Sequence, residues 1–149
     1  KLEPEPCQER CVDFTQLMPK DTFPAPFVYE GITFGPLGEG LYATSLGEPD
    51  DQMKLGFPRQ GLRMHFPLAV EKVVLTVNNY SGSTLTFRVF DVESFVREFS
   101  EPIVNEVKTL TIAEPSMSSI EISGGNNEAS LVEVCLCLPE RSEEEEKRG

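Results

Sequence analysis

Four cysteines are the residues whose type and spacing offer the clearest chemistry in this chain. Cys7 and Cys11 lie near the start of the 149 residues, and Cys135 and Cys137 lie near the end. Four thiolates could bind a zinc ion. However, Cys135 and Cys137 belong to an apolar, strand-like run, in which residues two apart point to one face about 6.5–7 Å from each other. That geometry is unfavourable for chelation, so we favour disulfides.

Antiparallel pairing of the first and last strands explains the cysteine positions. Paired residue numbers in such a ladder have a nearly constant sum, and the sums for Cys11–Cys135 and Cys7–Cys137 differ by only two. Each bridge would close most of the chain into a loop, which stabilises the fold by roughly 4–5 kcal/mol. Disulfides predict an oxidising, extracellular compartment. A Cys7–Cys11 bridge, a metal site and free thiols remain the alternatives.

Residues typical of catalysis are sparse. The chain has one histidine, His65, which alternates with apolar residues in a strand pattern and has no serine or cysteine beside it as a nucleophile. The glycine-rich stretch Gly35–Gly40 contains no lysine and precedes no helical pattern, unlike a phosphate-binding loop. We therefore expect no catalytic residues and no enzyme activity.

Charge excludes two further classes. The chain has 25 Asp and Glu against 13 Lys and Arg, a net charge of −12. A nucleic-acid-binding protein needs a positive surface, and a membrane span needs about 20 apolar residues in a run. We expect neither a nucleic-acid partner nor membrane insertion. No cofactor is required, although Asp50 and Asp51 offer oxygen ligands for a structural calcium ion, with solvated loop carboxylates as the alternative.

Alternation of apolar and polar residues dominates the chain from Leu62 onward and predicts strands. Tyr80–Ser83 has turn composition, so we expect the strands around 73–77 and 85–89 to form a hairpin. Further strands are expected at 62–66, 95–99, 107–112, 119–123 and 131–138, with a break at Pro115.

The first sixty residues are less regular. They contain two short strand-like runs, at 11–14 and 32–34, among many prolines and glycines. Eight or nine short strands without a helical pattern predict an all-β fold, a two-sheet antiparallel β-sandwich of jelly-roll type. We assign residues 1–6 to an extended N-terminal segment, 7–139 to the sandwich domain and 140–149 to a charged flexible tail.

The segment from Gly35 to Gly61 is the longest without a period, and long loops are usually functional. Within it we expect Tyr42, Arg59 and Gln60 to face a ligand or a neighbouring subunit. Leu55 and Phe57 would anchor the loop to a sheet. The alternative is that the apolar residues of this segment simply fold inward to cover a sheet.

Three stretches of the sequence resemble a known family. These are Cys11-Val12-Asp13-Phe14 with Gly31-Ile32-Thr33-Phe34, then Met64 to Val73, and then Ile120 to Glu128 with Leu131 to Cys135. Together they resemble the galactose-binding-like jelly roll of secreted bacterial proteins, shared with many carbohydrate-binding modules. The resemblance implies a non-catalytic extracellular module. It also implies a structural calcium site, for which Asp21 and Glu133 are the nearest matches.

Two functions follow as hypotheses. The first is a secreted or surface-attached binding and adhesion module whose partner is a carbohydrate. The second is a structural or assembly protein, such as a subunit of an extracellular filament, sheath or virion surface, whose partner is a neighbouring protein subunit, including a homo-oligomer. The absence of Trp, the acidic body and the extended termini fit the second function.

Overall fold

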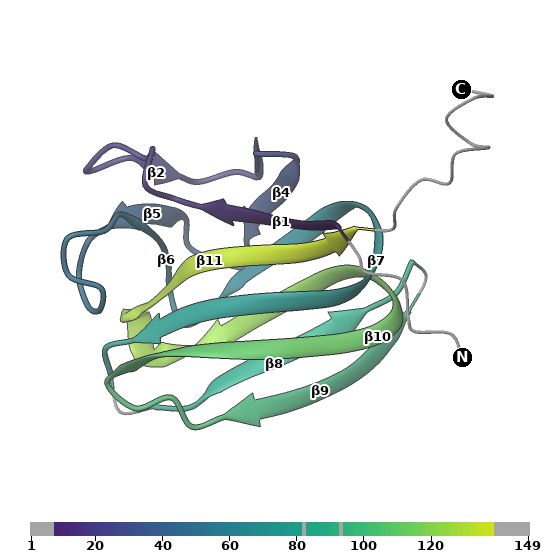
Figure 1. Cartoon of the computed structure of the whole chain (residues 1–149). Helices are drawn as coiled ribbons and strands as arrows, with labels where there is room; N and C mark the ends of the chain where they lie inside the picture. Colours follow the sequence, from purple (N-terminus) through teal and green to yellow (C-terminus); the bar gives the residue numbers. More distant parts are fainter. Residues whose placement is uncertain (1–7, 82, 93, 139–149) are drawn as a thin grey trace.

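The computed structural model describes residues 8–81, 83–92 and 94–138, and the chain over these ranges is built of strands (Figure 1). The predicted N-terminal segment 1–6, the tail 140–149 and Cys7 lie outside the described residues. In chain order the elements are β1 (Gln8–Asp13), β2 (Thr22–Phe23), β3 (Phe27–Tyr29), β4 (Ile32–Pro36), β5 (Leu41–Thr44), β6 (Lys54–Phe57), β7 (Leu62–Asn79), β8 (Leu85–Phe90), β9 (Phe95–Glu101), β10 (Glu106–Gly124), the 3₁₀ turn η1 (Gly125–Asn127) and β11 (Ala129–Leu138).

Two long strands, β7 and β10, lie side by side in the middle of the strand order. They pair antiparallel from Glu106 opposite Asn79 to Ile122 opposite Leu62, with register shifts between Ala113 and Ser119. Pro115 lies in this irregular stretch, where its missing N–H costs no ladder hydrogen bond. The predicted break at Pro115 is therefore a bulge within one continuous strand rather than a gap between two.

The halves of these strands have different neighbours, and this creates two layers. The first half of β7 lies beside β4, and the second half lies beside β11. The second half of β10 lies beside β8, which continues to β9. Figure 1 shows both long strands curving from one layer into the other. The buried apolar side chains of the two layers form one core. The strand order is β2-β5-β6-β11-β7-β10-β8-β9, with β1 added on β11 and β3 on β4.

The expected fold class is confirmed: the described chain is an antiparallel all-β sandwich. It has 11 strands rather than eight or nine. The additional strands β2, β3, β5 and β6 are two to four residues long, too short to produce a recognisable alternation between prolines and glycines. No helix in the described ranges is long and apolar enough to cross a membrane.

The predicted hairpin between residues 73–77 and 85–89 is wrong. Both segments are strands, but β7 pairs with β10, β11 and β4, whereas β8 pairs with β10 and β9. The turn carries the chain from one layer to the other. Asn79 stabilises this crossing, because its buried amide donates to the carbonyl oxygens of Ser83 and Ile103 at 2.6 and 2.9 Å.

The prediction that the terminal strands are joined is confirmed. β1 and β11 pair antiparallel with Cys11 directly opposite Cys135, and the two form a disulfide. The alternatives of a Cys7–Cys11 bridge and a four-thiolate zinc site are therefore wrong. Cys137 is also disulfide-bonded, and its predicted partner, Cys7, lies outside the described residues.

The segment Gly35–Gly61 is not one long loop. It contains the end of β4 and all of β5 and β6. Leu55 and Phe57 are fully buried on β6, so their expected anchoring role is confirmed. The irregular part is the shorter stretch between β5 and β6, which folds over the outer face of its layer.

Reduction of the disulfides should lower the free energy of unfolding by at least about 4–5 kcal/mol. Loss of the Cys11–Cys135 bridge alone, with its sequence separation of 124, removes that much. Urea unfolding with and without reductant measures this. Peptide mapping of the unreduced protein should recover Cys11 linked to Cys135; recovery of Cys11 as an alkylated thiol would contradict the structure.

A pair of Leu→Ala variants tests the burial of the segment between β4 and β7. Leu55→Ala should destabilise the fold by about 2–5 kcal/mol, because it opens a cavity in the core. Leu46→Ala, at a side chain that is 74% exposed, should change stability by less than about 0.5 kcal/mol. Equal effects of the two substitutions in urea unfolding would show that Leu55 is not packed as described.

Candidate functional site

A row of residues crosses the outer face of one layer and forms the base of the candidate site. Tyr42 on β5 lies opposite Gly56 on β6, Gly56 lies opposite Ser130 on β11, and Ser130 lies opposite Asn78 on β7. Residues directly opposite in a ladder project from the same face. The register therefore gathers side chains from four strands that are far apart in the sequence.

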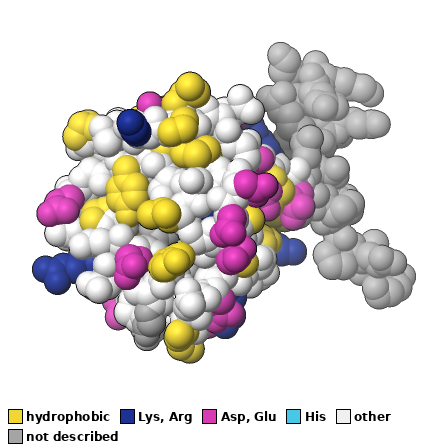
Figure 2. All heavy atoms as spheres, turned by 90° about the vertical axis from the view of Figure 1, so that its left-hand side faces the viewer, with side chains coloured by type: hydrophobic (Ala, Val, Ile, Leu, Met, Phe, Trp, Pro, Cys, Tyr) yellow, Lys and Arg dark blue, Asp and Glu magenta, His cyan; other side chains and the backbone are white. Residues whose placement is uncertain are grey.

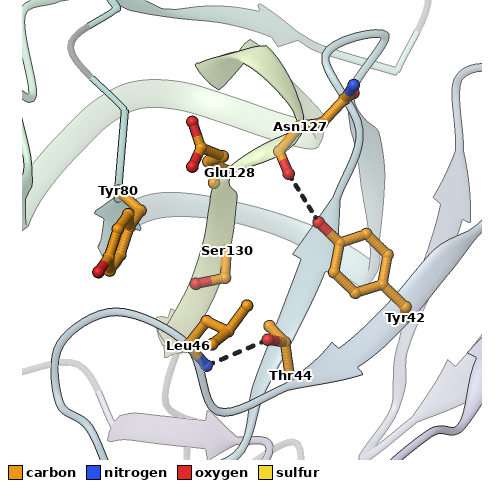
Figure 3. Close-up of a pocket in the computed structure, with 8 residues that line it drawn as sticks. Tyr42, Thr44, Leu46, Tyr80, Asn127, Glu128 and Ser130 are labelled. Carbon is orange, nitrogen blue, oxygen red and sulfur yellow. Dashed lines mark hydrogen bonds between the residues drawn. The ribbon is translucent and has the colours of Figure 1, made fainter.

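A pocket of about 210 Å³ opens at one end of this row. Its walls come from β5, the loop after β5, the residue after β7, the end of η1 and the start of β11 (Figure 3). The lining residues are Tyr42, Thr44, Leu46, Tyr80, Asn127, Glu128, Ala129 and Ser130.

Tyr42 forms one wall. A Cβ atom added at Gly56 would lie 2.2 Å from the Tyr42 ring, so the glycine allows the ring to lie flat across β6. The phenol hydroxyl donates to the carbonyl oxygen of Asn127 at 3.2 Å. Burial raises the pKa of the Tyr42 phenol, and the nearby Glu128 carboxylate raises it further. Tyr42 is therefore held in place as a neutral aromatic surface.

Tyr80 stands on the other side of the pocket in Figure 3. Its backbone N–H donates to the carbonyl oxygen of Glu128 at 2.9 Å, which ties the end of β7 to the start of β11. Its side chain is 54% exposed. The two tyrosines thus offer apolar faces on opposite sides, with Leu46 between them along the lower edge.

Ser130 lies between the two tyrosines in the interior of the pocket (Figure 3). The residue is 2% exposed, and its Oγ has no hydrogen-bond partner among the described residues. A buried hydroxyl without a partner is costly in free energy. Ser130 Oγ and Asn78 Oδ1, on the residue opposite it in the ladder, are the buried side-chain polar atoms without a hydrogen-bond partner among the described residues.

The predicted binding residues are separated by the fold. Tyr42 lines the pocket described above. Arg59 lines a second depression, together with polar and glycine residues around Gly124 and Ser83. Gln60 is exposed and lies over Gly38, where an added Cβ would come within 2.6 Å of its side chain. The binding role of these residues stays a prediction.

Tyr80, Glu128 and Ser130 are pocket residues that the sequence analysis missed. Tyr80 lies in a stretch with turn composition, and Ser130 is the second residue of the largely apolar strand β11, so neither carries a local signal of binding. Only the β6–β11–β7 register brings them beside Tyr42.

The predicted calcium ligands lie on separate elements. Asp21 precedes β2, and its carboxylate accepts a hydrogen bond from the Met18 N–H at 3.1 Å. Glu133 lies on β11 opposite Asp13. In the described ranges, the set of three metal-ligating side chains that lie close together is Glu9, Cys11 and Cys135, and its two sulfurs are joined in the disulfide. Calcium binding at Asp21 and Glu133 stays a prediction.

The pocket and the second depression belong to the side of the molecule where the β5–β6 loop and η1 lie. Figure 2 views this side, on which hydrophobic side chains form several separate groups among polar atoms, with acidic and basic side chains between them. Such a surface offers local apolar contacts rather than one continuous apolar patch. The described chain is thus an antiparallel β-sandwich with a small pocket on one side.

Solved structures to which the chain is similar include carbohydrate-binding modules. No family model matches the chain, and no curated protein matches it. Among solved structures, the CBM1 module of BiXyn10A is 12% identical with a TM-score of 0.47, over 89% of this chain and 99% of that chain. A family 6 carbohydrate-binding module is 8% identical with a TM-score of 0.45, over 87% of this chain and 93% of that chain.

A family two carbohydrate esterase from Cellvibrio japonicus is 10% identical with a TM-score of 0.44, over 91% of this chain. This chain spans 36% of that esterase. At these identities and at TM-scores below 0.5, these similarities carry no ligand or site residue over to this chain.

Substitution of the unpartnered serine tests the pocket in the free protein. Ser130→Ala should leave stability unchanged or raise it by about 1 kcal/mol, because it removes a buried polar group without a partner. Ser118→Ala is the matched control. Its hydroxyl donates to the carbonyl oxygen of Asp91 at 2.6 Å, so its loss should be destabilising. A loss of stability in Ser130→Ala equal to that of the control would show that Ser130 has a partner.

Proposed function

We propose that this protein is a non-catalytic, extracellular carbohydrate-binding module, and that the pocket between Tyr42 and Tyr80 holds one sugar ring. The observation that carries the proposal is the buried, unpartnered hydroxyl of Ser130 enclosed between two aromatic side chains. A sugar presents both an apolar C–H face, which packs on aromatic rings, and hydroxyls, which satisfy buried polar atoms.

The remaining groups of the pocket fit the same ligand. Glu128 offers carboxylate acceptors for sugar hydroxyls, and hydrogen bonds to a charged acceptor are the stronger kind. The cavity volume of about 210 Å³ is below the range of about 300–1,000 Å³ typical of pockets for drug-sized ligands. A single ring, such as the end of a glycan chain, matches this size.

The negative charge of the protein bears on whether the glycan is charged or neutral. Glu128 at the rim and the net charge of −12 disfavour a polyanionic chain, because like charges repel during the approach and within the complex. We therefore propose a neutral glycan. The Cys11–Cys135 disulfide supports an extracellular location, because such bonds persist in oxidising compartments.

An assembly subunit is the second candidate function, and strand β9 favours it. β9 ends the strand order, so one of its edges has no neighbouring strand within the described chain. Phe95 and Val96 on it are exposed. However, Arg97 and Glu98 occupy its middle, and charges of this kind protect an edge against pairing with another chain. This observation is weaker than the unpartnered hydroxyl of Ser130.

A glycan array followed by titration of the best ligand tests the proposal. Tyr80→Ala should weaken binding about tenfold, since an aromatic contact contributes about 1.4 kcal/mol. Ser130→Ala should weaken it by a similar factor through the lost hydrogen bond. Phe95→Ala is the matched control, because Phe95 on β9 is 53% exposed, as Tyr80 is 54% exposed, and lies in the other layer.

The array separates the two functions. Binding that depends on Tyr80 and Ser130 but not on Phe95 supports the carbohydrate-binding module. Silence on the array, together with concentration-dependent light scattering that Phe95→Ala abolishes, supports the assembly subunit and overturns the carbohydrate proposal.

A further inference from the structure

Lys54 is a fully buried lysine on the outer face of the same layer. It is 0% exposed and begins β6 opposite Thr44 on β5. A buried ammonium is costly in free energy unless hydrogen bonds or opposite charges replace its water. Other groups of the protein must therefore replace water around the Lys54 ammonium.

Four backbone carbonyl oxygens surround the ammonium, all from the stretch between β5 and β6, residues 45–53. Lys54 Nζ donates toward the oxygens of Ser45, Gly47, Pro49 and Gln52 at 3.2, 3.3, 2.5 and 3.0 Å. An ammonium has three N–H groups, so four acceptors exceed its donors. Backbone carbonyl oxygens are also among the groups that bind calcium ions in proteins.

Within residues 8–81, 83–92 and 94–138, no carboxylate forms an ion pair with this ammonium. Burial lowers the pKa of the Lys54 side chain, while the more distant carboxylates of Asp50, Glu48 and Asp51 raise it. Neutral carbonyls thus form the inner shell and acidic side chains form an outer one. Asp50 and Asp51 are the residues for which the sequence suggested a calcium ion.

We propose that the stretch 45–53 is a cation site whose permanent occupant is the ammonium of Lys54. The carbonyls point inward because a positive charge is there, and the lysine supplies that charge from within the chain. The site therefore holds its shape without a dissociable metal ion.

The stretch 45–53 also forms part of the pocket, so the Lys54 ammonium influences the shape of the pocket wall. Leu46 lines the pocket. The neighbouring Gly47 lies so close to Asn78 that an added Cβ would be 2.3 Å from Asn78 Oδ1. With the charge removed, the carbonyls of Ser45 and Gly47 lose their partner and turn toward water. The contact with Asn78 and the pocket wall should loosen together. This inference does not depend on which ligand the pocket binds.

Chemical rescue of Lys54→Ala tests the proposal in the full chain. The substitution removes three carbons and the ammonium, which n-propylammonium replaces. We expect the melting temperature of Lys54→Ala to fall by more than about 5 °C and n-propylammonium chloride to restore at least half of that loss. Sodium chloride at equal ionic strength and 1-propanol, which has the same shape without charge, should restore little. Lys72→Ala, at an exposed lysine of β7, is the control and should respond to none of them.

Each outcome decides the matter. Rescue confined to the amine and to Lys54→Ala supports a cation site. An unchanged melting temperature, or equal rescue by 1-propanol, shows that the side chain only fills space and overturns the proposal. If Lys54→Ala does not fold, nitrogen-15 spectra of the lysine side chains in the wild type decide instead. A slowly exchanging ammonium signal for Lys54 at neutral pH supports the proposal, and a neutral amine overturns it.

Discussion

The ladder between β7 and β10 is the constraint on which the rest of the structure depends. Each strand is long enough to belong to both layers, and each half has a different outer neighbour, β4 or β11 for β7 and β8 for the end of β10. The layers therefore cannot separate without breaking hydrogen bonds within a strand pair. The irregular stretch around Pro115 falls where the ladder bends, because a bulge increases the local twist and a proline lacks the N–H to bond there. The Cys11–Cys135 disulfide then fixes β1 on the far side of β11.

The candidate site is a consequence of the same register. A shift of β11 by one residue would turn Ser130 into the core and Leu131 outward, because successive side chains of a strand point to opposite faces. In the observed register Ser130 lies between Gly56 and Asn78. Gly56 has no side chain to cover β6, so the Tyr42 ring occupies that space and becomes a wall of the pocket. The polar interior and the aromatic wall therefore arise from one cross-strand row.

Alternation in the sequence predicted which residues are buried far better than which strands are neighbours. Leu62, Met64 and Phe66 are all buried, as their alternation with polar residues indicates. The prediction of a hairpin is wrong because alternation indicates which face of a strand a residue lies on, but not which strand lies next to it. The turn after Asn79 connects the two layers instead of two paired strands. The predicted pairing of the terminal strands is confirmed because a disulfide requires its two cysteines to lie close together. Tyr80 and Ser130 carry no pattern of their own, so no reading of local sequence would have joined them to Tyr42.

The charges near the pocket act at different ranges. Lys54 acts at hydrogen-bond distance, enclosed by carbonyls, whereas the net charge of −12 acts through solvent over about a Debye length. An acidic surface concentrates dissolved cations, which would compete for exposed carbonyl oxygens. A tethered ammonium resists this competition, because its effective concentration at the carbonyls is far higher than that of a free ion. A stretch between β5 and β6 that is held by Lys54 would keep Leu46 at the pocket in media of differing ionic composition.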